Sequence, residues 1–479
     1  MWTKRKLGVF AFAGILLCAG SVLFFTRPLT SRSVALNEPG IPFKFPSSND
    51  GTREHSPDDR DGSGLAGFTS NIPIIVFKTV WPGPVSTSKS YSLFDMTIYK
   101  PKGGEPARIG GNPALTTRVG LHVRGMLSRS FPKLSYRMKL QPEAGQKKGK
   151  DLLGMPADAD WVLHGPWLDK SLIRNAFSYD LARAIGCAAM RARPCELFLS
   201  NSGKPVTEAD YMGVYYLIED VERGKERVNL QKLSPQQNSE PEITGGYLLA
   251  WDVGEGRYLP SWKSIQLKYP KQPSRAQRLW IDRAITRFDH ALKGPDYRDS
   301  VKGYAAHIDV DAWVNYILFE EFIFNLDGYS RSFYMHKDRA GKLWPGPVWD
   351  HDLAMGHQFQ NGTRFDVWWY TLSGAHGWIQ RLASDPAFRD RMSQRWAALR
   401  KGLLSDSEIE RRIDRIAEPL LLGPAERNFQ RWDGLNLARP LPRPIDYITI
   451  KTDTYPEQIT AIKRFLRERA AWMDRNLGP

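Results

Sequence analysis

The stretch between Asn325 and the second of two aspartates, Asp350, has the residue types and spacing that best suit a chemical role. Its pattern predicts a helix that ends near Asn325, followed by a β-hairpin with strands at 332–336 and 343–348. Asp327 precedes the outgoing strand and Asp350 follows the returning strand. We therefore expect the two carboxylates to lie at the same edge of a sheet.

Two carboxylates held at one edge suit phosphoryl transfer. One can orient an attacking hydroxyl and accept its proton, while the other holds magnesium against the phosphates. The alternative is that Asp327 and Asp350 are turn residues, since Asp is common in turns. Asp352 would support Asp350 through a further contact or cap the segment that follows.

A metal hydrolase is a second interpretation of the same segment. Asp350, His351, Asp352 and His357 offer carboxylate and imidazole ligands. Side chains of neighbouring residues on a strand point to opposite faces, so His351 should point away from both aspartates. This alternation disfavours the hydrolase.

The elements that must position these residues change in character along the chain. Apolar residues alternate with polar ones in the first half, as at Val119, Leu121 and Val123, which predicts strands. One helix interrupts them, with Asp169 as its expected N-cap and Gly186 as its stop.

Beyond Gly245 the period is mainly helical, as in 313–324, 388–404 and 459–477. The order predicts an α+β domain at 71–478 with a strand-rich N-terminal lobe (71–244) and a helix-rich C-terminal lobe (245–478). The chemistry is expected in the cleft between the lobes.

The N-terminus predicts the compartment. Lys4, Arg5 and Lys6 precede an uncharged apolar run from Leu7 to Phe25, close to the roughly 20 residues that cross a bilayer as a helix. Positive charge before the run keeps that end in the cytoplasm, so residues 1–25 are expected to form a membrane anchor with the domain outside. The alternative is a cleaved signal peptide and a secreted or periplasmic protein. Residues 26–70, rich in Ser, Pro, Gly and Asp, are expected to be a flexible linker.

Composition narrows the classes of function. The chain has 479 residues and a net charge of +15, but its cations are scattered rather than grouped in runs. We therefore expect no nucleic-acid partner, and the sequence indicates no oligomeric state. Outside the cytoplasm, Cys187 and Cys195 are close enough in sequence to form a disulfide.

Several blocks of the sequence resemble, in their order, the CotH-type kinases, a family named for a spore-coat protein and distantly similar to protein kinases. The resemblance covers about residues 72–478. Its blocks are 124–137, 161–163 followed by 169–175, 213–219, 245–249 and 349–352.

The resemblance implies a kinase-like fold that uses ATP and Mg²⁺ or Mn²⁺. Lys133 would contact the nucleotide phosphates, and Glu219 would be its ion-pair partner or an acid near the metal. Asp327 would be the catalytic base, and Asp350, with Asp352 beside it, the metal ligand. Arg124 could reach a phosphate in bidentate fashion. Without the resemblance, Lys133 and Glu219 are typical of a solvated strand face and a structural ion pair.

Two positions depart from the family pattern. Ser332 stands where the family usually has Asn for a second metal, and Ala250 stands where it usually has Glu.

Together, the resemblance and the N-terminus predict a membrane-anchored kinase that phosphorylates Ser or Thr of an exported or cell-envelope protein. The alternative is a catalytically weak or inactive fold that serves as a cell-surface binding or assembly module.

Overall fold

The structure, a computed structural model, describes residues 65, 67–141, 149–357, 363–372, 377–432 and 452–477. Within them the chain is α+β, with strands dominating the first part and helices the second, as predicted. The division into two lobes at residue 245 stays a prediction. No helix in the described part is long and apolar enough to cross a membrane. The expected anchor at 1–25 lies outside that part, as does the expected linker at 26–70 except for its last residues, of which Thr69–Ser70 form strand β1.

The first part is built around a closed barrel. Val119, Leu121 and Val123 point into its apolar interior, as their alternation predicts. The strands follow the order β10-β11-β9-β6-β5-β3-β2, and only the closing pair of β2 with β10 is parallel. Their bounds are β2 Ile74–Thr79, β3 Ser92–Tyr99, β5 Leu115–Arg124, β6 Ser135–Leu140, β9 Asp160–His164, β10 Ala192–Ser200 and β11 Tyr211–Glu219. Two short ladders accompany the barrel: β1 with β4 (Ala107–Arg108), and β7 (Lys150–Leu152) with β8 (Met155–Asp158).

A second, antiparallel sheet contains the predicted hairpin. Its strand order is β13-β14-β12-β15-β16, with bounds β12 Tyr247–Trp251, β13 Tyr258–Leu259, β14 Trp262–Tyr269, β15 Phe333–Lys337 and β16 Leu343–Pro345. Gly245 lets the hairpin turn approach the start of β12, because a Cβ there would lie 1.9 Å from the backbone nitrogen of Arg339. The glycine of this sequence block is therefore required by packing.

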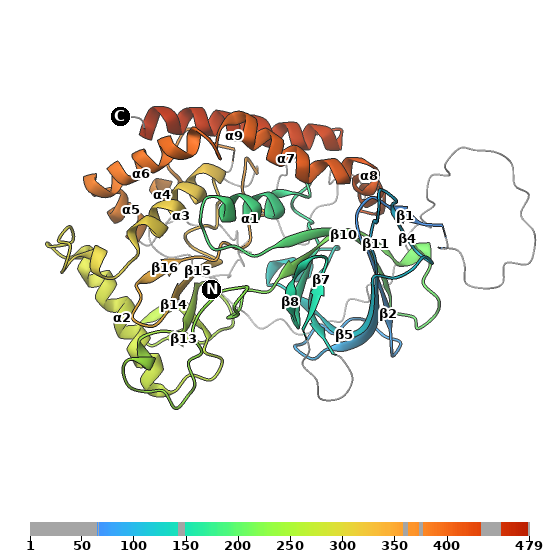
Figure 1. Cartoon of the computed structure of the whole chain (residues 1–479), viewed down its shortest axis with the longest axis horizontal. Coiled ribbons are helices and arrows are strands. Elements are labelled where there is room, and N and C mark those ends of the chain that lie inside the picture. The colour runs from blue at the N-terminus through green and yellow to red at the C-terminus, as the bar shows by residue number, and fades with distance from the viewer. Residues whose placement is uncertain are drawn as a thin grey trace, which may run out of the picture. The chain divides into compact units, whose positions relative to one another are not determined.

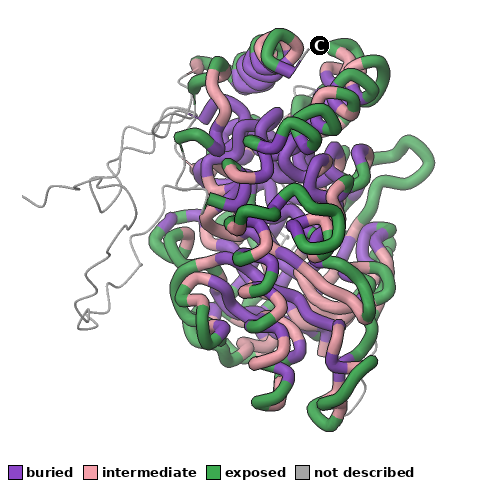
Figure 2. Tube along the Cα trace, turned by 90° about the vertical axis from the view of Figure 1, so that its left-hand side faces the viewer, coloured by how far each residue is buried: buried purple, intermediate pink, exposed green. Residues whose placement is uncertain are grey.

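The helices share one large apolar core with the second sheet and the outer faces of β9 and β11 (Figures 1 and 2). Helix α3 packs against α6 and α9, and α7 lies beside α9. The bounds are α1 Arg174–Ala184, α2 Arg275–Lys293, α3 Val310–Ile323, α4 Trp369–Leu372, α5 Trp378–Ala383, α6 Pro386–Arg400, α7 Asp406–Leu421, α8 Pro424–Arg431 and α9 Tyr455–Leu477. The 3₁₀ turns are η1 Leu127–Ser130, η2 Glu208–Asp210, η3 Glu242–Thr244 and η4 Tyr304–Ala306.

The ends of α1 correct one expectation and confirm another. Its N-cap is Ile173 rather than Asp169. Asp169 still serves the helix start from further upstream, since its carboxylate accepts a hydrogen bond from the backbone N–H of Arg174 at 2.8 Å. Gly186 follows the helix with φ +96°, a conformation that favours glycine, so the predicted stop is confirmed.

The disulfide that the spacing of Cys187 and Cys195 allows is not formed, because both residues are free thiols. Cys195 on β10 lies in the barrel interior, whereas Cys187 belongs to the core that the helices share. The two side chains therefore point into different cores.

Candidate functional site

The β15–β16 hairpin brings its two flanking segments together as predicted. Helix α3 ends at Ile323, Asp327 lies in the loop that follows, and Asp350 comes after the returning strand. The hydroxyl of Ser332, at the start of the hairpin, donates a long hydrogen bond of 3.5 Å to the Asp350 carboxylate. Ser332, the position where the family usually has Asn, thus lies directly beside the predicted metal ligand.

Three carboxylates influence one another at this edge. The pKa of Asp350 is raised to about 6 by loss of hydration and then by the negative charges of Asp352 and Asp327. Asp350 keeps solvent-accessible surface, so the protein shields it only in part. Burial raises the pKa of Asp327, with smaller contributions from Asp252 and Asp352, while Arg331 opposes the rise. At both Asp350 and Asp327, neighbouring carboxylates therefore add to the effect of burial.

Asp352 is fixed by side chains from the barrel and from α1. Its Oδ1 accepts a hydrogen bond of 2.6 Å from the Asn175 amide and lies 3.3 Å from Nε2 of His164. Burial acts to raise the pKa of Asp352, but His164 outweighs it, with His357 and Arg174 contributing, so the pKa lies below its ordinary value. Asp352 is thus held as a carboxylate beside Asp350.

The first two residues of α1 hold the segment that carries these aspartates. Asn175 accepts a hydrogen bond of 2.8 Å from the backbone N–H of His351. The buried guanidinium of Arg174 donates to the carbonyls of Ala354 at 2.8 Å and Met355 at 3.3 Å, and pairs with Asp169 at 2.6 Å. Both residues belong to one of the family blocks, and their contacts explain why the block contains them.

Arg124 is a cation that the structure brings near Asp350. Its guanidinium lies over the ring of Trp349, 5.3 Å from the ring centre, and its charge lowers the pKa of Asp350. Trp349 in turn stacks on Tyr179 of α1, whose hydroxyl accepts a hydrogen bond of 3.2 Å from the backbone N–H of Asp350. This stack positions a cation and a carboxylate on neighbouring segments.

Lys133 has different surroundings from those the resemblance implies. Its buried ammonium donates hydrogen bonds of 2.6 Å to the carbonyl of Val214 and 2.6 Å to Oδ1 of Asn428, and it lies 5.1 Å from the ring centre of Tyr215. Burial, and then the charge of Lys170, holds the pKa of Lys133 well below its ordinary value. These contacts join α8 to β11, and they do not include Asp350 or Glu219.

Glu219 pairs with arginines rather than with Lys133. Its carboxylate lies 2.7 Å from Nη1 of Arg191, accepts a hydrogen bond from that residue's backbone N–H at 2.8 Å, and lies 3.9 Å from Arg227. The ion pair between Lys133 and Glu219 that the resemblance implies is therefore not formed in this structure. Glu219 instead joins the end of β11 to the start of β10.

His351 points away from the aspartates that flank it, but strand alternation is not the reason, because residues 350–352 form no strand and Asp350 has φ +66°. Its Nε2 lies 3.3 Å from the Glu320 carboxylate, and its ring packs edge-on against Phe319 and Tyr179. His357 is buried, and burial together with Arg174 lowers its pKa to about 3. This arrangement gives the hydrolase interpretation no set of converging ligands.

The residues around Asp350 fit a magnesium or manganese ion bound together with phosphates. Magnesium is commonly held by one or two carboxylates, with phosphates and water completing its coordination. The hydrogen bond that Asp350 receives from Ser332 is long and weak, and its pKa is raised by loss of hydration and then by the negative charge of Asp352 and Asp327. A divalent cation would neutralise that charge.

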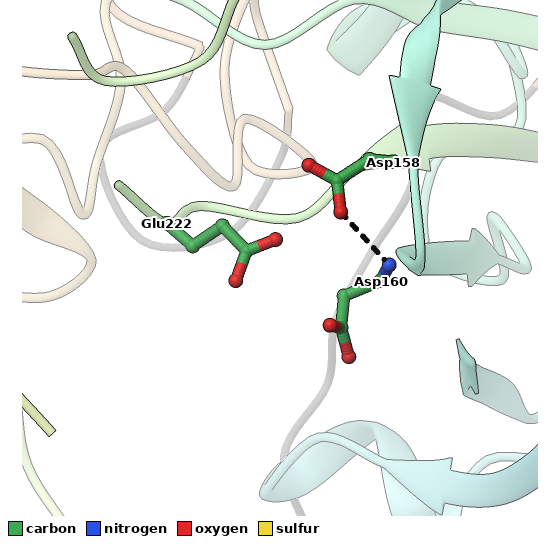
Figure 3. A group of neighbouring side chains, drawn as sticks. All are labelled: Asp158, Asp160 and Glu222. Atoms are coloured by element: carbon green, nitrogen blue, oxygen red, sulfur yellow. Dashed lines mark hydrogen bonds between the residues drawn. The ribbon is translucent and has the colours of Figure 1, made fainter. Parts of the chain in front are cut away.

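A second acidic group lies near the ends of β8 and β11 (Figure 3). Oxygen atoms of Asp158, Asp160 and Glu222 lie within 4.8 Å of one another. Loss of hydration, and then Asp158 and Asp160, raises the pKa of Glu222 to about 7. Arg227 lies 3.5 Å from Asp158 and 3.9 Å from Glu222, so a cation of the chain already faces this group.

The sequence did not single out His164, Asn175, Tyr179 or Tyr334. Asn175 lies within a family block, and His164 directly follows another, so the blocks carried a signal for both. Tyr334, on β15, has its pKa raised to about 12 by burial and then by Asp252, while Arg124 opposes the rise. Its place beside the carboxylates depends on strand pairing that sequence spacing alone does not determine.

Comparisons with known proteins identify a family over the part of the chain that contains this site. A family model described as CotH kinase protein matches residues 121–473, a range that contains the whole carboxylate site. None of the curated proteins compared with the chain matches it. Among solved structures, the complex of HipA, HipB and operator DNA from the Shewanella oneidensis MR-1 toxin–antitoxin system is 11% identical, with a TM-score of 0.22. The match covers 83% of this chain and 66% of that chain.

Proposed function

The chain belongs to the CotH kinase family, and on this basis we propose that it is an atypical protein kinase. In this proposal it transfers the terminal phosphoryl group of ATP to a Ser or Thr hydroxyl. Family membership supports a kinase-like fold. The observation that carries the proposal is the juxtaposition of Asp327, Asp350 and Asp352 with the guanidinium of Arg124.

Each residue of the site has a chemical role in this reaction. Asp327 accepts the proton of the attacking hydroxyl as its oxygen bonds to the terminal phosphorus and the bond to ADP breaks. Burial raises the pKa of Asp327, which makes it a better proton acceptor. Asp350 holds the divalent cation, which when bound neutralises charge on the phosphates. Arg124 contacts a phosphate oxygen.

Asp352, Asn175 and His164 act by positioning. They hold the segment of Asp350 against β9 and α1 through the contacts at 2.6 and 3.3 Å. The resemblance assigns the phosphate contact to Lys133, but its ammonium is buried and already hydrogen-bonded to Val214 and Asn428. We therefore assign that contact to Arg124 and a structural role to Lys133.

The proposed substrate is an exported or cell-envelope protein. The basic N-terminus and the apolar run that follows it support a membrane-anchored kinase whose domain faces away from the cytoplasm. The positive charge is scattered along the sequence, and we therefore propose that the protein has no nucleic-acid partner. The two-lobed arrangement, with the site between the lobes, is part of the same proposal.

Ser332 supports a second candidate, an inactive kinase-like fold that serves as a binding or assembly module. In kinases the residue at this position is an Asn that binds a second metal ion. A hydroxyl is a weaker magnesium ligand than an amide oxygen, and the Ser332 hydroxyl already points to Asp350. The two candidates differ in whether the site binds ATP with metal productively.

Calorimetric titration with ATP in the presence of Mg²⁺ tests the proposal. ATP should bind and raise the melting temperature, since a ligand of the folded state stabilises it. Asp350→Asn should weaken Mg²⁺-dependent ATP binding at least tenfold. Asp311→Asn is the matched control, because this exposed carboxylate on α3 pairs with Arg391 at 2.9 Å and makes no contact with the carboxylate site among the described residues. Absence of binding to the unmodified protein would favour the binding module.

A further inference from the structure

A cavity of about 250 Å³ lies between helix α2, the turn η4 and the β15–β16 hairpin (the elements are labelled in Figure 1, except η4). Residues Trp280, Ala284 and Arg287 of α2 line it, at a spacing that places them along one face of the helix. Its volume is slightly below the roughly 300 Å³ at which pockets for drug-sized ligands begin. None of the residues of the carboxylate site lines it.

The inner wall of the cavity is apolar. Ile285, Phe288 and Leu343 are buried and contribute to this wall. Trp280 is partly buried, and its ring stacks on Tyr247, with ring centres 5.8 Å apart and planes at 6°. Such a wall suits the apolar or aromatic body of a ligand.

The ionisable groups of the cavity are basic. Arg287, His307 and Lys337 line it beside the neutral Thr244, and no acidic residue does. The ammonium of Lys337 lies 5.3 Å from the ring centre of Trp280, and the Arg287 guanidinium lies 6.0 Å from it. Two cations thus lie over the aromatic ring of the apolar wall.

These cations lack a carboxylate partner within the cavity. Lys337 donates a hydrogen bond of 2.6 Å to the carbonyl of Gly341, and the exposed Arg287 makes no hydrogen bond or ion pair with the residues that the structure describes. Burial lowers the pKa of Lys337 to about 8, with Asp338 opposing and Arg287 adding to the effect. Burial, and then Arg287, also lowers the pKa of His307. A bound anion would relieve this repulsion.

We propose that this cavity binds a small organic anion. Its apolar body packs against Trp280, Phe288 and Leu343, and its carboxylate or phosphate group lies between Arg287, Lys337 and His307. The proposal is independent of the proposed kinase function, because it depends on residues that the carboxylate site does not use. Lys337 ends β15 at the hairpin turn, whereas Ser332 and Asp350 flank the opposite end of the hairpin. Occupation of the cavity should therefore leave ATP binding possible.

Calorimetric titration of the whole protein with 2-naphthoate, 2-naphthyl phosphate and the neutral 2-naphthamide tests the proposal. At least one of the two anions should bind, and at least tenfold more tightly than the amide. Whichever anion binds better identifies the preferred head group, and either order supports the proposal. Absence of anion binding, or equal binding of the amide, would overturn it.

Variants locate the binding. Arg287→Gln, at an exposed position, and Lys337→Met should each weaken anion binding at least fivefold. Arg283→Gln is the matched control, since Arg283 is also exposed on α2 but does not line the cavity. Asp350→Asn should leave anion binding unchanged. Anion binding that Asp350→Asn removes and Arg287→Gln leaves intact would assign the anion to the carboxylate site and overturn the proposal.

Discussion

The acidic group of Asp158, Asp160 and Glu222 predicts that one neutral substitution will stabilise the protein in a pH-dependent way. The Glu222 side chain is 18% exposed, and its pKa is raised from 4.5 to about 7. A raised pKa in the folded state means that folding takes up a proton between these two pH values. The stability associated with the protonated carboxyl is fully present below pH 4.5 and is lost as the pH rises to about 7.

The size of the effect follows from that pKa difference. At about 1.4 kcal/mol for each pH unit, the charged Glu222 costs the folded state about 3 kcal/mol above pH 7. Glu222→Gln removes the charge without changing the shape of the side chain. We expect this variant to gain about 2–3 kcal/mol in free energy of unfolding at pH 8 and under about 1 kcal/mol at pH 5.

Urea unfolding followed by tryptophan fluorescence at pH 5 and pH 8 measures both differences. Glu226→Gln is the control, because it makes the same change in net charge at an exposed position of the same segment. A gain that is equal at the two pH values, or no larger than that of Glu226→Gln, would refute the reasoning.

Three further substitutions test individual contacts. Lys133→Met should lower the free energy of unfolding by about 1–3 kcal/mol in urea titrations, because Asn428 loses a buried partner. The rate of phosphoryl transfer should stay within about threefold of the unmodified protein. Lost transfer with unchanged stability would show that Lys133 contacts phosphate. Asn175→Ala should lower kcat about 10- to 100-fold, because Asp352 and the backbone of His351 lose their hydrogen-bond partner. The circular dichroism spectrum should stay unchanged. An unchanged kcat would argue against the positioning role of Asn175. Gly245→Ala should destabilise the protein by several kcal/mol, because the added Cβ would clash with backbone atoms. Gly402→Ala is the control, since a Cβ there has open space and should change the melting temperature little. Equal melting temperatures of the two variants would show that the hairpin turn can move.

The sequence predicted those parts of the fold that depend on local pattern. The hairpin around Asp327 and Asp350 follows from alternation and turn residues within one short segment, and the structure confirms it. The end of α1 at Gly186 was predicted for the same reason, because a glycine with positive φ is a local signal. The predicted N-cap of α1 was wrong, because Asp169 contacts the helix from five residues before Arg174.

The rest depends on contacts between distant segments. Lys133 donates a hydrogen bond to Asn428, which is 295 positions away in the sequence, and no local pattern around either residue predicts this contact. Asp352 meets Asn175 across 177 positions, so its support could be expected but not its partner. The sequence could not decide whether Cys187 and Cys195 form a disulfide for a similar reason, because they are close in sequence yet face different cores.

Phosphoryl transfer from ATP labelled in its terminal phosphate tests the proposed kinase most directly. The protein would be assayed for phosphorylation of itself and of a generic acidic protein with Mg²⁺ or Mn²⁺, beside Asp327→Asn, Asp350→Asn and the control Asp311→Asn. We expect label on Ser or Thr that both site substitutions reduce at least 100-fold and that the control retains. Transfer that survives both substitutions, or none from the unmodified protein under conditions where ATP binds, would contradict the proposal.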